Sequence, residues 1–267
     1  MSSTLQDMFQ TVTAFLHDAS VELVGDPPVG GTLVTEFHDF SGQPLPLVPV
    51  DGSALQAVDT RTVTSSIQVI TDINLWFSLE SPAAGGAFNG DYYMRLEHES
   101  SFSILLNRTG RRTGPDPDAA FGYGDNGFDI ILDDQAPSGD IHTYRLQLPL
   151  TPGGPAGLSH DTAVDPTFQS ALTGTWSPDG RNVSPFSVSS DDARTHLLSQ
   201  FNGMPATGNW TLLISDLNAG GTASLRGWGI QVSGHTVVPE PSHMAVVVGL
   251  ALAVAAALRH SRFRRRP

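Results

Sequence analysis

The sequence of 267 residues lacks cysteine and lysine. The absence of cysteine excludes the small folds that depend on disulfide bonds. All 14 basic residues are arginine, against 27 acidic residues, which gives a net charge of −13. Nucleic-acid binding depends on clustered Lys and Arg side chains, and the nine arginines before residue 259 form no basic stripe. The composition therefore excludes a nucleic-acid partner, while its 39% hydrophobic content allows one packed domain with appendages.

No apolar run reaches the roughly 20 residues that a transmembrane helix usually needs. The longest run is 244–258, with fifteen residues that are all apolar or glycine. It predicts a single short hydrophobic helix at the C-terminus, and this helix makes the membrane a partner. An arginine cluster follows the run and would stay on the cytoplasmic side, which places the acidic body on the other side. The cluster consists of Arg259, Arg262, Arg264, Arg265 and Arg266.

A proline motif stands directly before the apolar run. Its residues are Val238, Pro239, Glu240, Pro241 and Ser242, and the two prolines favour an extended, accessible peptide. Segment 236–267 thus resembles the PEP-CTERM sorting signal of some Gram-negative bacteria, with its Pro-Glu-Pro motif, apolar helix and arginine-rich end. The resemblance implies recognition by a membrane exosortase, removal of the helix, and export to the cell surface or matrix. The alternative is a plain short anchor preceded by a proline linker.

The N-terminal segment 1–20 does not fit the leader that an exported protein should carry. Residues 1–16 contain no basic residue, whereas a signal peptide begins with a charged region. Leu5, Met8, Phe9 and Val12 instead follow the spacing of an amphipathic helix. We therefore expect either a leader upstream of the given start or another export route, and favour the former.

The body, residues 21–235, is predicted to be all-β. Apolar residues alternate with period two in segments separated by Gly, Pro, Asn and Asp, as in half-buried strands. The clearest strands are expected at 73–79, 92–98, 102–106, 128–132, 210–214 and 228–232. One short helix is expected over 191–200, between Ser190 and the Asn202-Gly203 pair. The pattern favours an antiparallel β-sandwich.

Several segments in this body resemble the P domain of proprotein convertases, with the match strongest over 62–234. They include 90–98, 105–108, 127–134, 198–203, 208–212 and 225–230, and the Gly-x-Trp-Thr-Leu of 208–212 is the most specific of them. The resemblance implies a jelly-roll-like antiparallel sandwich of about eight strands, without a nucleophile of its own.

Motifs for catalysis are incomplete. No Gly-x-Ser-x-Gly elbow occurs in the chain. His98-Glu99 begins a zinc-binding His-Glu-x-x-His motif, but position 102 is Phe. Residues 122–127 match the Gly-x-Gly-x-x-Gly pattern of dinucleotide-binding sites. Such a site needs a strand before the motif and a helix after it, and neither is predicted here, so we interpret the segment as a loop between strands. We expect no enzyme activity.

Two ligand sites remain as candidates. Asp125, Asp129, Asp133 and Asp134 lie in one acidic stretch and are the candidate ligands for calcium, the only cofactor considered, because Ca²⁺ prefers oxygen ligands. The alternative is that these are solvated turn residues. Trp176, near Gly174 and Pro178, is the one tryptophan expected at the surface, where it could stack on a sugar.

Three functions follow from these features. The first is a non-catalytic sandwich protein, membrane-anchored before processing and then located at the cell surface or in the extracellular matrix, with a protein or exopolysaccharide partner. The second is an accessory P domain of a subtilisin-like protease system. The third is a carbohydrate-binding jelly roll.

Overall fold

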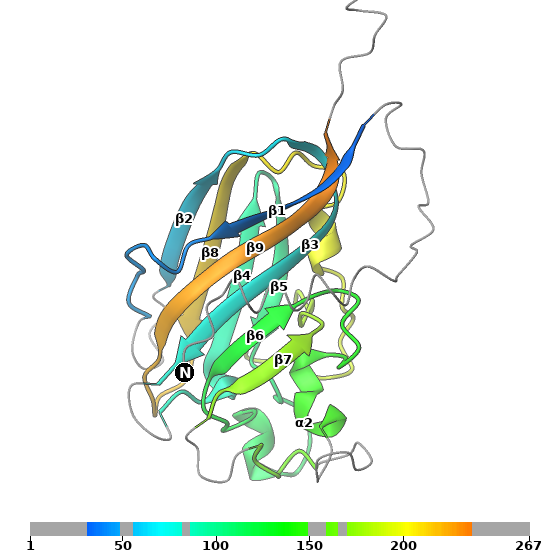
Figure 1. Ribbon diagram of the computed structural model, residues 1–267. Helices are drawn as coiled ribbons and strands as arrows, with labels where there is room; N and C mark the ends of the chain where they lie inside the picture. The colour runs from blue at the N-terminus through cyan, green and yellow to red at the C-terminus, as the bar shows by residue number, and fades with distance from the viewer. Residues whose placement is uncertain (1–30, 49–55, 82–85, 149–158, 165–169, 237–267) are drawn as a thin grey trace, which may run out of the picture.

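The computed structural model describes residues 31–48, 56–81, 86–148, 159–164 and 170–236. These residues form two β-sheets packed face to face as a sandwich (Figure 1). The prediction of an all-β sandwich is therefore confirmed. The predicted N-terminal segment 1–20 and the C-terminal helix 244–258 lie outside the described residues.

The larger sheet has five strands in the order β1-β9-β3-β6-β7. Its strands are β1 (Leu33–Asp39), β9 (Ser224–Thr236), β3 (Ile67–Glu80), β6 (Phe128–Leu132) and β7 (Leu172–Trp176). The second sheet has four strands in the order β2-β8-β4-β5. These are β2 (Ala57–Val63), β8 (Gly208–Asp216), β4 (Tyr92–His98) and β5 (Ser101–Asn107).

The pairing differs from the prediction at one place. All neighbouring strands are antiparallel except β6 and β7, which run parallel with Phe128 opposite Leu172. Parallel strands need a connection of about a dozen or more residues, and residues 133–171 supply one. The described residues thus contain nine strands in place of about eight, and the sandwich is not wholly antiparallel.

The prediction of a helix over 191–200 is wrong. This region contains only the start of the short 3₁₀ helix η5 (Leu198–Phe201). The backbone N–H groups of Thr195 and His196 both donate to the carbonyl of Gly180, so this backbone is paired with another segment rather than with itself. The other short helices are η2 (Asn89–Asp91), η3 (Pro117–Ala120), η4 (Ile141–Thr143) and α2 (Tyr144–Gln147).

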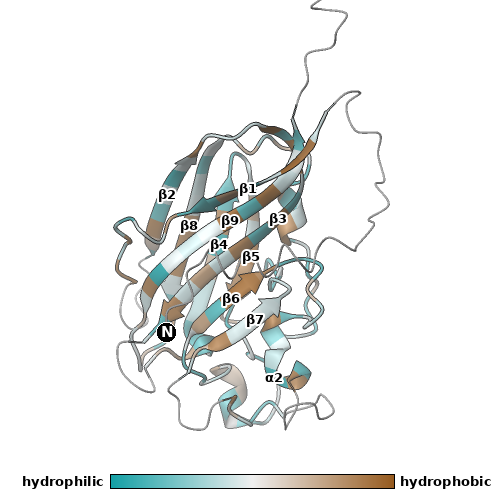
Figure 2. Cartoon of the chain, viewed as in Figure 1, coloured by the Kyte–Doolittle hydropathy of each residue, from teal (hydrophilic) through white to brown (hydrophobic). Residues whose placement is uncertain are grey.

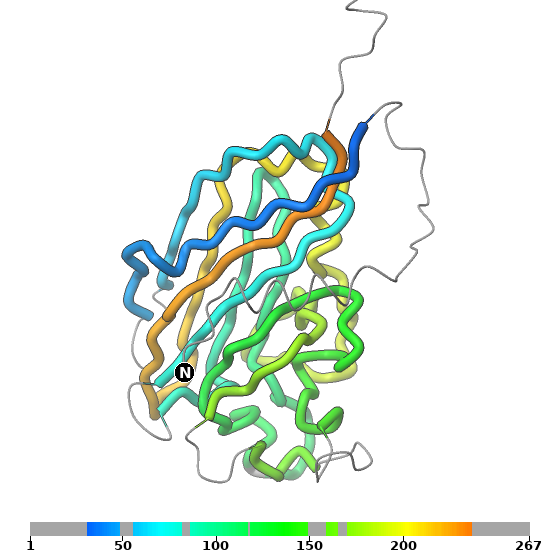
Figure 3. The backbone as a smooth tube through the Cα atoms, in the orientation of Figure 1, coloured from blue at the N-terminus to red at the C-terminus, as the bar shows by residue number. Residues whose placement is uncertain are grey.

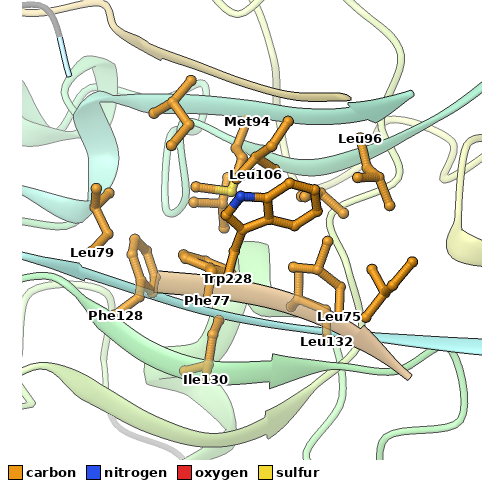
Figure 4. Close-up of a cluster of buried hydrophobic side chains, with 14 of the residues drawn as sticks. Leu75, Phe77, Leu79, Met94, Leu96, Leu106, Phe128, Ile130, Leu132 and Trp228 are labelled. Atoms are coloured by element: carbon orange, nitrogen blue, oxygen red, sulfur yellow. The ribbon is translucent and has the colours of Figure 1, made fainter. Parts of the chain in front are cut away.

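The hydrophobic core lies between the two sheets. Alternate residues of β3 and β4 point into it, as the sequence predicts, and the hydropathy bands along β3 follow this alternation (Figure 2). Trp228 of β9 projects toward Met94 and Leu106 of the other sheet (Figure 4). Its indole Nε1 donates to Oδ2 of buried Asp59 at 2.6 Å, which satisfies the one polar atom of the ring.

β3 and β9 run side by side along the larger sheet and define its two ends (Figure 3). Ile67 pairs with Thr236 at one end, and Glu80 pairs with Ser224 at the other. The 14 residues of β3 span about 45 Å at roughly 3.3 Å per residue. Phe88, which follows β3, and Asn218, which follows β8, lie near this second end and line one pocket with residues of η3 and α2. We call the Glu80–Ser224 end the loop end.

Candidate functional site: a polar pocket at the loop end

The loop end contains a pocket of about 470 Å³. Five separate segments contribute its walls, so it exists only because the fold brings distant loops together. Its lining residues are Phe88, Asp91, Arg112, Asp118, Phe121, Gly122, Tyr123, Gly124, Arg145, His160, Asp161, Ala163, Asn218 and Ala219. We call it the loop-end pocket.

Glycines allow the central loop of the pocket to pack closely. A Cβ atom at Gly90 would lie 2.3 Å from the carbonyl oxygen of Phe121. Gly122 has a φ of +83°, and a Cβ there would lie 2.5 Å from the carbonyl oxygen of Thr109. The glycine-rich segment 122–127 is thus a loop that leads into β6, as predicted.

Buried Asp125 fixes the position of Arg145, which lines the pocket. Its Oδ2 accepts hydrogen bonds from the Tyr144 hydroxyl at 2.5 Å and from Nε of Arg145 at 2.7 Å, and its Oδ1 accepts from the backbone N–H of Val164 at 2.9 Å. Burial opposes the charge of Arg145, but the hydrogen bond and charge of Asp125 outweigh it and raise the pKa of the guanidinium. Arg145 is therefore held in one position as a fixed cation.

Tyr123 and His160 form the adjoining wall. The Tyr123 hydroxyl lies 2.7 Å from Nδ1 of His160, and the guanidinium of Arg145 lies 4.6 Å from the centre of the Tyr123 ring. Burial and the nearby positive charge of Arg112 lower the pKa of His160, so this imidazole is neutral at neutral pH. Burial raises the pKa of Tyr123 well above its usual value. Both side chains are uncharged hydrogen-bonding groups.

The residues that line the pocket supply many hydrogen-bonding groups. Within the described part of the chain they include no Ser, Thr or Cys. Their hydrogen-bonding groups come from carboxylates, guanidinium groups, Tyr123, His160 and Asn218. Such a set can hold a polar ligand in one orientation.

The structure separates the four predicted calcium ligands into different roles. Asp125 belongs to the loop-end pocket network, and Asp129 accepts from the indole of Trp76 at 3.0 Å. Asp133 accepts from the backbone of Gln135, whereas Asp134 accepts from two backbone N–H groups at the start of η5. The described residues contain no group of three or more His, Asp or Glu side chains arranged to hold a metal ion. Calcium binding stays a prediction, which a calcium titration of the melting temperature tests.

An additional acidic residue, Asp72, lies near two of these carboxylates. Burial raises its pKa to about 6, and the charges of Asp133 and Asp134 contribute to the increase. The sequence gives no sign of this proximity, because β3 and the end of β6 are far apart along the chain.

The prediction that Trp176 lies at the surface is wrong. Trp176 ends β7 and is buried in the core, and its Nε1 donates to the carbonyl of Thr173 at 3.0 Å. The exposed aromatic ring at the loop-end pocket is Phe121, which is 54% exposed. The sequence could have indicated this exposure. Phe121 lies in a polar loop rich in Pro and Asp, where no strand face is available to bury an apolar ring.

The motif residues 238–242 and the arginine cluster lie outside the described residues, as does the predicted helix 244–258. Among the helices that the structure does describe, none is long and apolar enough to span a membrane.

Comparison with known proteins gives no match to a protein-family model, to a curated protein or to a solved structure.

Proposed function

We propose that this chain is a non-catalytic, exported β-sandwich protein of the cell surface or extracellular matrix. In this proposal its C-terminal segment is a PEP-CTERM signal that an exosortase-type enzyme recognises. The motif around Glu240 is the processing site, the apolar run is the transient membrane helix, and the arginine cluster holds the end of the chain on the cytoplasmic side.

The relation between this signal and the sandwich supports the proposal. β9 ends at Thr236, only two residues before Val238, and Thr236 lies at the opposite end of the long strands from the loop-end pocket. A sandwich held through its C-terminus would therefore present the pocket away from the point of attachment. This arrangement suits a surface protein that binds a ligand outside the cell.

A more specific fold, a P-domain-like jelly roll, is part of the same proposal. The order of the segments that resemble a convertase P domain, from Gly90 to Ile230, favours a P-domain-like jelly roll. Trp210 and Trp228, which lie in two of these segments, are both buried, as core residues of such a sandwich would be.

Substitution of the motif glutamate tests the proposal. Glu240→Gln should leave an unprocessed, membrane-retained chain, because the change removes the only charge of the Pro-Glu-Pro motif and keeps its shape. The matched control is Glu80→Gln, at a half-exposed glutamate of the sandwich, which should be processed like the parent. Membrane fractionation followed by mass spectrometry of the intact chain gives the readout. Equal processing of the Glu240 variant and the parent would overturn the proposal.

A further inference from the structure

We propose that the loop-end pocket binds a neutral sugar unit of a polysaccharide. The binding itself follows from the pocket, whereas its assignment to a surface or matrix polysaccharide rests on the export proposed above. The ligand class follows from three properties of the pocket, which are its charge balance, its fixed donor and its exposed aromatic ring.

The charges of the pocket favour a neutral ligand. Its lining contains three carboxylates, those of Asp91, Asp118 and Asp161, against two guanidinium groups. Both guanidinium groups are already paired: Arg145 with Asp125, and Arg112 with Asp116 and Asp161. An anionic ligand would meet more negative than positive charge, and each arginine already has a carboxylate partner and so offers no free counter-charge to an anion. A polyhydroxylated neutral ligand avoids this repulsion and can still hydrogen-bond to the carboxylates.

The pocket offers a preorganised hydrogen-bond donor. The side chain of Arg145 is 7% exposed. Its Nε donates to Asp125, and its Nη1 donates to the carbonyl of His160 at 2.6 Å. In the described part of the chain, its Nη2 has no hydrogen-bond partner, yet this atom is not among the buried unpaired atoms. Arg145 lines the pocket and two of its nitrogens are fixed by hydrogen bonds, so Nη2 is a positioned donor that a ligand hydroxyl can reach.

Acceptors and an apolar ring complete the site. Asp118 and Asp161 line the same pocket and are exposed, so their carboxylates can accept from ligand hydroxyls. Phe121, which lines the same pocket, is about half exposed. A sugar ring has hydroxyl groups around its edge and C–H groups on its faces, so it can use the carboxylates, Nη2 and the aromatic face together. The volume of the pocket also lies within the ordinary range of small-molecule sites.

Saturation-transfer difference NMR on the full-length chain, kept in a detergent without a sugar headgroup, tests the inference. The probes are the methyl glycosides of glucose, galactose, mannose and N-acetylglucosamine, with glucuronate as an anionic comparison. At about 10 mM, which exceeds a millimolar Kd, at least one neutral glycoside should show transfer and glucuronate should show less. Phe121→Ala should weaken the binding about threefold to tenfold, as expected for loss of an aromatic contact. Asp118→Asn should also weaken it.

The control variant is Phe186→Ala. Phe186 is 64% exposed and does not line the pocket, so its loss should leave the transfer unchanged. Melting curves of all three variants verify that they fold. Absence of transfer from every neutral glycoside, or stronger transfer to glucuronate, would overturn the inference. So would equal binding by the parent and both pocket variants. An exported and processed chain that binds none of these glycosides would overturn this inference alone and leave the proposed function standing.

Discussion

Nδ1 of His142 lies 2.7 Å from Oδ2 of Asp179 in a fully buried pair. Nε2 of the same ring lies 2.8 Å from the carbonyl oxygen of Arg111, so both ring nitrogens face oxygen atoms. Asp179 also pairs with Arg181, and Arg181 pairs with Asp140, which precedes η4. This network ties η4 to the segment after β7, close to the loop-end pocket.

The pair predicts a pH-dependent stability. Burial opposes the imidazolium of His142, but the charge of Asp179 outweighs it and raises the histidine pKa. A raised pKa in the folded state stabilises the fold below the unfolded pKa of about 6.5. This stabilisation is lost as the pH rises through the raised value. Urea unfolding from about pH 6 to 9 should therefore show falling stability, and His142→Gln should remove this dependence.

The variant should also be less stable at neutral pH. Removing one partner of a buried ion pair typically costs about 3–5 kcal/mol, because the other charge is left buried. The pKa of Asp179 is lowered: burial opposes its charge, but the charges of His142 and Arg181 outweigh burial. Its contribution is present above the unfolded pKa and is lost as the pH falls through the lowered value. A parent and a variant with parallel profiles between pH 6 and 9 would contradict the assignment.

Removing the charge of Asp72 should stabilise the protein, whereas removing the imidazole of His142 should destabilise it. The Asp72 pKa of about 6 means that the folded state prefers the neutral carboxyl group. The stabilisation is complete below an unfolded pKa of about 3.9 and is lost as the pH rises through about 6. Asp72→Asn should therefore stabilise the protein at pH 7 by about 1–2 kcal/mol and have little effect near pH 4. Asp191→Asn, at an exposed loop position, is the control in the same denaturation series.

The indole hydrogen bond in the core predicts a specific loss. Trp228→Phe removes the donor to Asp59, leaves a partly unpaired carboxylate and opens a small cavity. Thermal unfolding should show a loss of about 2–4 kcal/mol. Oδ2 of Asp59 also accepts from Nε of Arg61 at 2.8 Å, so a double-mutant cycle with Asp59→Leu isolates the indole contact: Trp228→Phe should cost less in the Asp59→Leu background than in the parent. An equal cost in both backgrounds would argue against the hydrogen bond as the main cause.

The close approach at Gly90 predicts that this residue controls the shape of the loop-end pocket. Gly90→Ala places a methyl group against the backbone around Phe121 and should destabilise the protein by about 1–3 kcal/mol. Gly42→Ala is a matched control, because a Cβ there has no atom within 4 Å. The melting temperature should fall for the first variant and change little for the second.

Alternation predicts the strands with many residues in the core, such as β3 and β4, because a two-residue period reports which side chains face inward. It does not predict β7, which has five residues, includes Gly174 and pairs in parallel with β6. The end signals at Ser190 and Asn202-Gly203 were misleading for 191–200, because the backbone N–H groups of Thr195 and His196 donate to the carbonyl of Gly180 in the preceding loop.

The loop-end pocket was not predictable from the sequence. Phe88, Arg145 and Asn218 are more than 50 residues apart from one another, and only the ends of the strands bring them together. The acidic stretch 125–134 shows the same limitation. Its residues are close in sequence, but the alternation of β6 and the turns around it point their carboxylates at different partners.

Export and processing are tested most directly by mass spectrometry of the native protein after fractionation of the cells that make it. We expect a chain at the cell surface or in the medium whose C-terminus lies before Met244. Recovery of the chain from the cytosol with Arg264, Arg265 and Arg266 still attached would contradict this expectation.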